Sequence, residues 1–490
     1  MIKKDLKPVS VFRFFQEING IPRPSKHEER MIAYLEKFGK DRGLETVTDE
    51  IGNVLIRKNA SKGYEGRPTI ILQSHIDMVC DKVAGHEIDF LNDPIEAYTD
   101  GEWMRANGTT LGADDGIGCA IELALLDDDT IEHGPIECLF TRDEETGLTG
   151  ANGLRAGFLK GSMLLNLDSE DEGLFYVSCA GGKTTTAKFR YTPEDAPKDC
   201  FFMQASVKGL TGGHSGDDIN KKRANAIKLL ARFLYLEQRK MPVRLAQFNA
   251  GKLHNAITRE GSIVFAVPFE EKETVRVDWN IFCSDVEEEF QVTEKSIVWH
   301  MESTDRQMVM PKECGEKIIT ALQAVHNGVF SVCQDDALGG MTETSSNTAV
   351  ISTTVAGEEN NQGECRIVCS QRSNVMSNLT NMVNTVRAVF ELAGADDITH
   401  SDGYPAWTMN PESKLRAVAE KCYKELFGNA PKITGIHAGL ECGLFAQKYP
   451  YLDMLSIGPT MRGVHSPDER LHIPSVEKVW RLVLGILKEV

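Results

Sequence analysis

Apolar residues follow two different spacings in the first third of the chain and again at its end. Helical spacing predicts helices at residues 8–20, 28–43, 115–127, 412–427 and 474–490. Short apolar runs predict strands at residues 68–77, 135–145, 162–171 and 451–459. Apolar strands that alternate with helices are typical of a buried, mainly parallel sheet. These two parts of the chain therefore predict one α/β domain.

The middle of the chain has a different pattern, with more polar, alternating strands such as KTTTAKFRYTPED. Further strands are predicted at residues 262–268, 295–301 and 364–373, and helices at residues 219–238, 271–290, 314–327 and 374–394. A strand, a turn and a long helix occur twice here, which hints at a duplicated half, although the residues match too poorly for a repeat. We therefore predict a mainly parallel mixed sheet flanked by helices, residues 1–186 and 403–490, interrupted by an inserted α+β domain, residues 187–402.

Length and charge narrow the range of partners. A chain of 490 residues is too long for one simple core, which agrees with two domains. Acidic residues outnumber basic ones 72 to 54, and the formal charge of -18 argues against nucleic acid and anionic membranes as partners. No stretch approaches the roughly eighteen apolar residues of a membrane span, and we expect no signal peptide at the start. Small molecules, peptides and cations are left as partners.

The twelve cysteines are scattered through apolar segments. They form no CxxC pair, and the closest spacing is that of Cys365 and Cys369. This usage is typical of reduced, mostly buried thiols, so we expect a cytoplasmic protein without a cysteine-based zinc site.

Acidic residues and histidines gather where the predicted strands end. The stretch LGADDGIG places Asp114 and Asp115 side by side in a glycine-rich loop before a helix, although Asp-Gly is also a common turn. The residues at the other strand ends are His75, Asp77, Glu144, Glu145, Asp168 and His465. Each of them alone is compatible with a turn or a solvated loop. Because ligands of parallel α/β sheets lie beyond the carboxyl ends of the strands, the set together predicts one shared crevice.

So many carboxylates cannot share a dry crevice without cations. Two divalent metal ions, each with about four imidazole and carboxylate ligands, would solve this problem. The ligands would be His75 and Asp168 for one ion, His465 and Glu145 for the other, and Asp114 as the bridge. Glu144 would then be free to take a proton from the attacking water. Asp77, on the same face of an extended chain as His75, would fix the imidazole.

The chain resembles the dinuclear-zinc exopeptidases of the carboxypeptidase G and peptidase T type in the motifs SHIDMV, LGADDGIG, TRDEETGLTGA, LLNLDSED, GGHSG and GVHSPDE. Within that family it is most similar to the aminoacyl-histidine dipeptidases, which act on carnosine-like dipeptides, in the motifs LNLDSEDEG, CAGG, IHAGLECG and ETSSN. The resemblance runs from IPRPS near the start to the final helix. It implies a zinc exopeptidase fold in which the inserted domain is a lid.

The resemblance also implies roles for individual residues. The metal ligands would be the same set, with Asp114 bridging, Glu144 as the general base and later the proton donor to the leaving amine, and Asp77 as the orienting residue. The peptide bond between Asp114 and Asp115 would be cis. His214 of GGHSG, in the inserted domain, would donate to the oxyanion of the tetrahedral intermediate. It would come either from a partner subunit's lid or from a duplicated half of the same lid.

Dipeptides carry a free carboxylate and a free ammonium that the protein must recognise. Arg372 is the candidate for the carboxylate, because a guanidinium binds it with two hydrogen bonds. Asn255 could hold a backbone group, and His437 and Glu441 of IHAGLECG, placed in the catalytic domain, could meet the amino end. His254 is a further candidate. A structural role is the alternative for each of these residues.

We therefore predict a two-metal dipeptidase that hydrolyses Xaa-His and broader dipeptides, with zinc as the metal and cobalt or manganese as alternatives. A tripeptidase or an N-acyl amino acid deacylase on the same scaffold is one alternative function. A non-catalytic metal- or peptide-binding homologue is another. The sequence leaves the side-chain preference and the oligomeric state open, including a homodimer formed through the lid domain.

Overall fold

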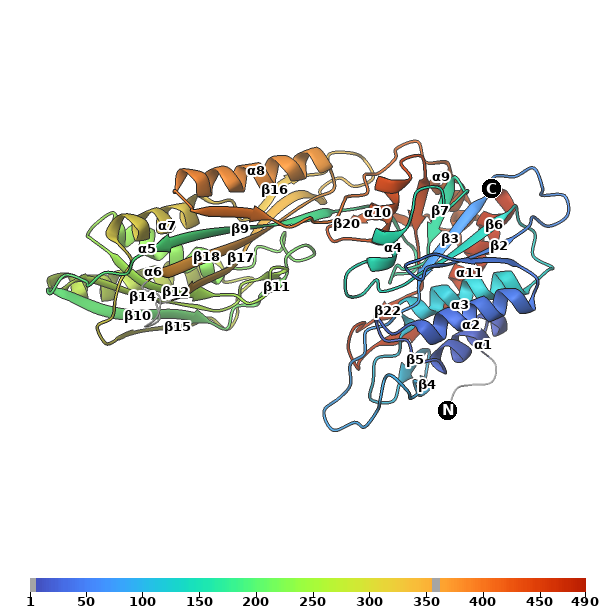
Figure 1. The fold of residues 1–490 in the computed structure, drawn as a ribbon, viewed down its shortest axis with the longest axis horizontal. Coiled ribbons are helices and arrows are strands. Elements are labelled where there is room, and N and C mark those ends of the chain that lie inside the picture. The colour runs from blue at the N-terminus through green and yellow to red at the C-terminus, as the bar shows by residue number, and fades with distance from the viewer. Residues whose placement is uncertain (1–5, 355–361) are drawn as a thin grey trace. The chain divides into compact units, whose positions relative to one another are not determined.

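The computed structural model describes residues 6–354 and 362–490, which form two compact units (Figure 1). Unit 1 comprises Met1–Ser178, Trp407–Gly435 and Leu440–Val490, and unit 2 comprises Cys179–Ala406 and Ile436–Gly439. The first five residues of the segment considered for a signal peptide lie outside the described residues. Within the described part of the chain, no helix is long and apolar enough to cross a membrane.

Unit 1 is built on an eight-stranded sheet with the order β1-β2-β6-β3-β7-β21-β8-β20. Its strands are β1 (Glu45–Thr48), β2 (Val54–Lys58), β3 (Ile70–His75), β6 (Ile136–Thr141), β7 (Met163–Asn166), β8 (Leu174–Cys179), β20 (Lys432–Ile436) and β21 (Asp453–Ser456). The central strands β6, β3, β7 and β21 are parallel, whereas β1, β2 and β8 pair antiparallel with their neighbours. The carboxyl ends of the four parallel strands therefore lie at one edge of the sheet.

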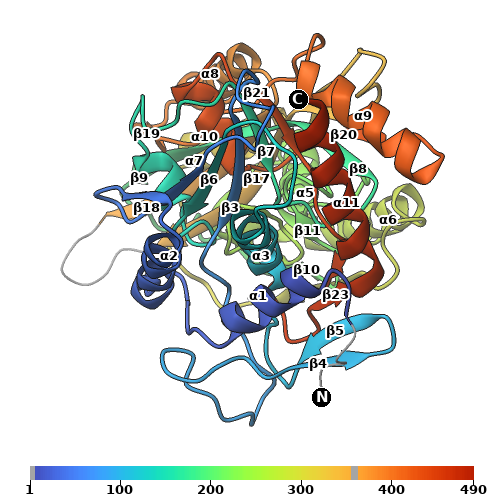
Figure 2. The same cartoon turned by 90° about the vertical axis from the view of Figure 1, so that its right-hand side faces the viewer.

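Helices cover this sheet (Figure 2). They are α1 (Val9–Asn19), α2 (Glu29–Asp41), α3 (Ala113–Asp127), α4 (Thr149–Gly153), α9 (Lys414–Phe427), α10 (Glu441–Lys448) and α11 (Ile473–Glu489). Helix α3 packs on β3 and is covered in turn by α1, which explains why its residues are apolar on nearly every side. A small sheet of β22 (Met461–Arg462), β23 (Arg470–His472), β5 (Trp103–Ala106) and β4 (Ala97–Asp100) holds the two ends of the loop that carries His465.

Unit 2 contains a nine-stranded sheet with the order β15-β10-β14-β12-β17-β18-β9-β19, and β16 pairs with β17. The strands are β9 (Gly181–Tyr191), β10 (Cys200–Lys208), β12 (Arg244–Ala250), β14 (Gly261–Pro268), β15 (Val298–Ser303), β16 (Gly328–Val332), β17 (Thr342–Thr354), β18 (Gly363–Ser373) and β19 (Asp397–His400). Four helices pack against it in the order α6 (Lys272–Glu289), α5 (Ala226–Gln238), α7 (Lys312–Ala324) and α8 (Met376–Leu392).

The two halves of this sheet share one topology. From the centre outward, one half runs β12-β14-β10-β15 and the other runs β17-β18-β9-β19. Along the chain, each half reads strand, helix, strand, strand, helix, strand, and the first half is inserted between β9 and α7 of the second. The halves join where β12 and β17 pair antiparallel at Ala250 and Ile351. The two strand, turn and helix segments noted in the sequence are β10 with α5 and β18 with α8. They occupy different positions in the two halves, because β10 and α5 correspond to β9 and α7, whereas β18 and α8 correspond to β14 and α6.

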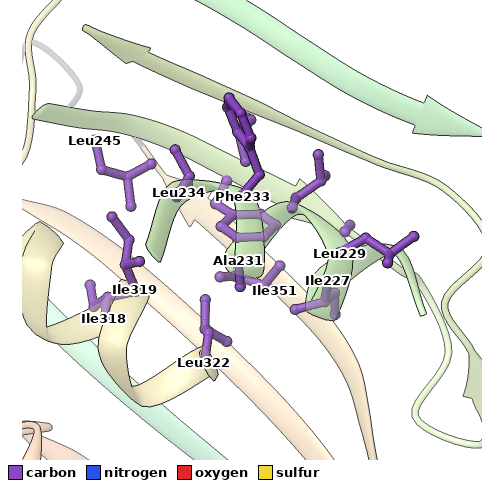
Figure 3. Close-up of a cluster of buried hydrophobic side chains, with 14 of the residues drawn as sticks. Ile227, Leu229, Ala231, Phe233, Leu234, Leu245, Ile318, Ile319, Leu322 and Ile351 are labelled. Atoms are coloured by element: carbon purple, nitrogen blue, oxygen red, sulfur yellow. The ribbon is translucent and has the colours of Figure 1, made fainter. Parts of the chain in front are cut away.

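The core of unit 2 lies between the sheet and these helices. Figure 3 shows side chains of this core, among them Phe233 and Leu234 of α5, Leu322 of α7 and Leu245 of β12. All four side chains are buried, so the two halves share one hydrophobic core rather than two separate ones.

Three sequence expectations differ from the structure. Helix α5 begins at Ala226 rather than at residue 219, because the Asn225 side chain accepts the N–H groups of Ile227 and Lys228 and caps the helix there. Strand β17 was not predicted, since its sequence TETSSNTAVISTT is rich in hydroxyl residues rather than apolar ones. The segment Ile436–Gly439 belongs to unit 2, because Ala180 N–H pairs with the carbonyls of Ile436 and Ala438.

Candidate active site

The sheet of unit 1 brings the predicted metal ligands together at the carboxyl ends of its parallel strands. His75 is the last residue of β3, Glu145 follows β6, and Asp168 follows β7. Asp114 lies in the first turn of α3, and His465 lies in the loop between β22 and β23. Residues that are up to 390 positions apart in the sequence thus converge, because parallel strands all end at the same edge.

Asp114 lies between the two histidines. Its Oδ1 is 3.1 Å from Nε2 of His75, and its Oδ2 is 3.1 Å from Nε2 of His465. Nε2 of His465 is also 3.0 Å from Oε2 of Glu145, and Nε2 of His75 is 3.4 Å from Oδ1 of Asp168. The five residues therefore form two groups, each with one imidazole and one terminal carboxylate, that share the Asp114 carboxylate.

Asp77 supports this arrangement through contacts with His75 and with the backbone of Glu144 and Glu145. Its Oδ1 lies 3.3 Å from Nδ1 of His75 and accepts the backbone N–H of Glu144 at 3.0 Å. Its Oδ2 accepts the Ser25 hydroxyl at 2.8 Å and the backbone N–H of Glu145 at 3.2 Å. One buried carboxylate thus fixes the tautomer of His75 and the backbone of both glutamates.

Asp115 lies beside Asp114 but contacts neither histidine through any described hydrogen bond. The peptide bond between the two aspartates is cis, as the resemblance implies. The Asp115 side chain is fully buried, and its Oδ1 accepts the backbone N–H of Gly118 at 3.1 Å. It therefore caps the regular part of α3, which begins after the non-helical residues 114 and 115.

The electrostatics of the cluster reflect crowded acids. Burial alone would lower the pKa of His75, but Asp168, Asp114 and Asp77 outweigh it and raise that pKa well above the ordinary value. Hydrogen bonds that the ring donates to the carboxylates of Asp114 and Glu145 raise the pKa of His465 to about 11. The protein thus favours positive charge at both imidazoles, which is the condition that a bound cation satisfies.

Two acids at this edge, Glu144 and Asp168, hold a proton more readily than usual. Burial, reinforced by neighbouring carboxylates, raises the pKa values of Glu144 and Asp168 well above their ordinary range. Glu144 is not among the residues that contact the two histidines through a described hydrogen bond. Glu144 is therefore an acid near the cluster whose carboxylate neither histidine engages.

These residues fit divalent metal ions. Ligand atoms of His75, Asp114 and Glu145 all lie within 4.8 Å of one another, and imidazole nitrogen with carboxylate oxygen is the donor set that zinc and related ions take. A second acidic group, Glu28, Asp77 and Asp143, is equally compact. Its carboxylates already accept donors from Arg142, Ser25, Thr146 and Thr149 and from the chain's own N–H groups. That second group is accordingly structural.

The structure separates the two residues expected at the amino end of the substrate. Glu441 lies in unit 1, is fully buried, and accepts hydrogen bonds from the Gln73 amide at 2.6 Å and the Thr141 hydroxyl at 2.8 Å. Burial raises its pKa to about 7. His437 lies in unit 2, not in the catalytic part as expected, because its loop pairs with Ala180. Its ring nitrogens contact Ser345 at 2.8 Å and Asn374 at 3.2 Å.

Unit 2 brings Arg372 and His214 together. Nη2 of Arg372 lies 3.3 Å from Nε2 of His214, whose Nδ1 is 3.2 Å from Oδ2 of Asp217. Arg372 also donates to the Tyr404 hydroxyl at 2.6 Å and to the Ser215 hydroxyl at 3.3 Å. The guanidinium is buried, yet no carboxylate of the described residues forms an ion pair with it. A buried cation with only neutral partners is suited to an anionic group of a ligand.

Asn255 and His254 lie in the loop next to His214. The β-bridge of β11 (Gly213–His214) with β13 (Ala256–Ile257) joins the two loops, and the Asn255 carbonyl accepts the Ser215 N–H at 2.9 Å. Both side chains are exposed. Partial burial and the nearby Arg372 lower the pKa of His254.

Sequence reasoning missed three residues that hold these groups in place: Arg23, Tyr404 and Glu469. Tyr404 contacts Arg372, Arg23 donates to the carbonyls of Ile76 and Asp77, and Glu469 accepts backbone N–H groups of the Asp114 loop. Glu469 sits in the same motif as His465, GVHSPDE, and that proximity was the available signal.

Comparison with known proteins agrees with this geometry. The sequence profile of peptidase family M20/M25/M40 matches residues 71–489. The cytosol non-specific dipeptidase of Escherichia coli strain K12 is 40% identical over 488 residues, which cover 99% of this chain and 98% of that protein.

Solved structures of peptidases also match this chain. The aminoacylhistidine dipeptidase of Vibrio alginolyticus matches with a TM-score of 0.91 and 41% identity, covering 99% of this chain and 98% of that chain. A tripeptidase from Staphylococcus aureus matches with a TM-score of 0.58 and 17% identity over 99% of this chain and 98% of that chain. At that identity the second likeness concerns the fold alone.

Proposed function

This chain belongs to peptidase family M20/M25/M40 and hydrolyses peptide bonds, and on that premise we propose that it is a two-metal dipeptidase. The observation that carries the proposal is the position of Asp114, whose two carboxylate oxygens each lie 3.1 Å from a different histidine. A carboxylate placed in this way is suited to bridge two cations.

The ligands in this proposal are His75 and Asp168 for one ion, His465 and Glu145 for the other, and Asp114 for both. Zinc is the first choice, with cobalt or manganese as alternatives, because mixed imidazole and carboxylate sites accept all three. When bound, the two ions polarise the peptide carbonyl and make water a better nucleophile. Asp77 holds His75 in the tautomer that leaves Nε2 free to bind.

Glu144 is the proposed proton carrier. Its carboxylate is not among the proposed ligands, and Asp77 fixes its backbone N–H. Burial, reinforced by neighbouring carboxylates, raises the pKa of Glu144 well above its ordinary value, which favours a group that takes up a proton and returns it later. Glu144 therefore takes a proton from the attacking water and passes it to the leaving amine.

Arg372 is the proposed binding residue for the free carboxylate of a dipeptide. Its guanidinium is buried without an acidic partner among the described residues, and Tyr404 and Ser215 hold it in one orientation. His214 and Asn255 lie next to it, so we assign His214 to the carbonyl oxygen of the scissile bond and Asn255 to a backbone group.

Glu441 and His437 are the proposed residues for the amino end of the dipeptide substrate. Among the described residues, none donates a hydrogen bond to the buried Oε1 of Glu441, so this oxygen is suited to an ammonium group. His437 is held neutral, since burial and Arg372 lower its pKa to about 3. A neutral ring can accept a hydrogen bond without repelling the substrate's positive charge.

The preferred substrates in this proposal are Xaa-His and broader dipeptides, in line with the names of the two relatives of about 40% identity. Purified protein should be incubated with β-Ala-His, Ala-His, Ala-Ala, Ala-Ala-Ala and N-acetyl-histidine in the presence of zinc, cobalt or manganese. Cleavage of the dipeptides with little cleavage of the last two supports a dipeptidase. Preferential cleavage of Ala-Ala-Ala or of N-acetyl-histidine would instead favour a tripeptidase or a deacylase.

We also propose that the protein works in the cytosol. Its twelve cysteines, all among the described residues, form no disulfide there, and the Escherichia coli relative is named as a cytosolic enzyme. Fractionation of cells followed by activity measurement on β-Ala-His tests this, and recovery of the activity with the envelope would contradict it.

A further inference from the structure

We propose that Glu469 is a positioning residue that holds the Asp114 loop and the His465 loop in the relative geometry that two metal ions need. The inference rests on the proposed function, because it concerns the same pair of metal ligands. It assigns a role to a buried carboxylate that takes no part in the proposed chemistry.

Four backbone N–H groups of the Asp114 loop donate to Glu469. Oε2 accepts from Leu111 at 2.6 Å and Gly112 at 3.0 Å, and Oε1 accepts from Ala113 at 2.8 Å and Asp114 at 3.3 Å. The side chain is only 2% exposed. Both oxygens are thus filled by donors, so this carboxylate has no capacity left to act as a ligand itself. It defines the path of the backbone into Asp114.

The same residue belongs to the turn that carries His465. The Glu469 N–H donates to the Ser466 carbonyl at 3.0 Å, and the Ser466 hydroxyl donates to the Gly463 carbonyl at 2.7 Å. His465 lies within this turn, and its ring contacts the Asp114 carboxylate at 3.1 Å. The turn therefore contacts the Asp114 loop twice, once through the Glu469 carboxylate at the backbone N–H groups of the loop and once through the His465 ring at the Asp114 side chain.

Arg23 holds the opposite side of the same loop. Its Nη2 donates to the Gly112 carbonyl at 2.5 Å, and its Nη1 donates to the carbonyls of Ile76 at 3.0 Å and Asp77 at 2.7 Å, next to His75. Gly112 has a positive φ of 67°, and a Cβ there would lie 2.6 Å from Nη2 of Arg23. A carboxylate thus binds the N–H groups of the loop while a guanidinium binds its carbonyl.

Glu469→Gln tests the inference because it changes shape very little. An amide can accept the N–H groups on one side only, and it turns its own N–H₂ towards the donors on the other side. We expect the loop to shift and the Kd for cobalt to rise by about 10- to 100-fold, the usual loss when an outer residue of a metal site is changed. The visible absorption of bound Co²⁺ should change as well, which a purely structural role would leave intact.

Co²⁺ titration of the metal-free full chain, followed by calorimetry and by absorption, gives both readouts. Circular dichroism establishes that each variant is folded. Glu469→Asp keeps the charge but draws it back from the donors, so it should weaken binding by less than Glu469→Gln does. The matched control is Glu477→Gln, an exposed acid eight residues further on, which should bind cobalt as the wild type does.

Weaker cobalt binding and an altered spectrum in folded Glu469→Gln, with Glu469→Asp in between, support the positioning role. Unchanged affinity and spectrum beside normal wild-type binding would overturn it and leave the proposed function standing. If the wild-type protein bound no cobalt, the proposed metal site would be wrong, and the positioning role with it.

Discussion

Asp77 Oδ1 lies 3.3 Å from Nδ1 of His75, and the same carboxylate accepts the N–H groups of Glu144 and Glu145. One side chain therefore couples a proposed ligand to the proposed proton carrier. Asp77→Asn should disturb both. The amide would place its own N–H₂ group opposite a backbone N–H group that now donates to the carboxylate, and two donors cannot pair.

We expect Asp77→Asn to bind zinc about 10- to 100-fold more weakly than the wild type and to lose activity that added zinc restores only in part. Competition with a zinc chelator measures the affinity. The exposed variant Asp402→Asn is the control. Wild-type affinity in Asp77→Asn would show that His75 is oriented by other contacts.

Glu144→Gln should separate metal binding from turnover. The variant keeps all five proposed ligands, so elemental analysis should find the wild-type metal content. It removes the group that moves the proton, which typically contributes about 10²- to 10⁴-fold to the rate, so kcat should fall by that order with little change in KM. A kcat within a few-fold of the wild type would mean that another group carries the proton.

Arg372→Ala should remove the discrimination between a free and a blocked carboxyl terminus. A hydrogen bond to a charged group is worth about 1.5–3 kcal/mol, which is about a 10- to 100-fold change in KM. Comparing β-Ala-His with its C-terminal amide measures this. The wild type should prefer the acid, whereas Arg372→Ala should treat the two alike.

The exposed variant Arg259→Ala serves as the control for the loss of a positive charge in unit 2 and should keep the preference. A preference for the free acid that survives in Arg372→Ala would place carboxylate recognition elsewhere.

Metal binding should release protons and strengthen as the pH rises. Hydrogen bonds that the ring donates to the carboxylates of Asp114 and Glu145 raise the pKa of His465 to about 11, so in the metal-free protein this imidazole carries a proton at neutral pH. A metal ion needs the neutral imidazole and must displace that proton. Affinity therefore increases with pH up to the pKa of His465.

Calorimetry of zinc binding at pH 7 in buffers of different ionisation enthalpy counts the protons released. The count should fall in His465→Ala, which lacks the titrating group. An affinity that does not change between pH 6 and pH 8 would contradict the expected protonation of the cluster.

The convergence of His75, Glu145 and Asp168 could be predicted from the sequence because the physical signal is local and repeated. His75 ends one apolar strand, Glu145 and Asp168 lie in the loops that follow two others, and strands of a parallel sheet end at one edge. Asp114 was recognisable by its glycine-rich loop before a buried helix. The alternating strands and helices of the central sheet were equally visible in the spacing of apolar residues.

Other parts could not be predicted, because their partners are backbone groups far along the chain. Glu469 and Ala113 are 356 positions apart, and nothing in either motif indicates that one accepts the N–H of the other. His437 was assigned to the catalytic part, since no local pattern shows that its loop pairs with Ala180. Strand β17 was missed because hydroxyl residues are buried in it through pairing with β16 and β18, not through apolar side chains.

The central claim is that Asp114 joins two metal sites in one chain, and titration of metal-free protein with zinc tests it most directly. Activity on β-Ala-His should rise with added zinc and level off at two equivalents per chain, and elemental analysis of the saturated protein should give the same number. Full activity at one equivalent, with a single ion bound per chain, would contradict the account.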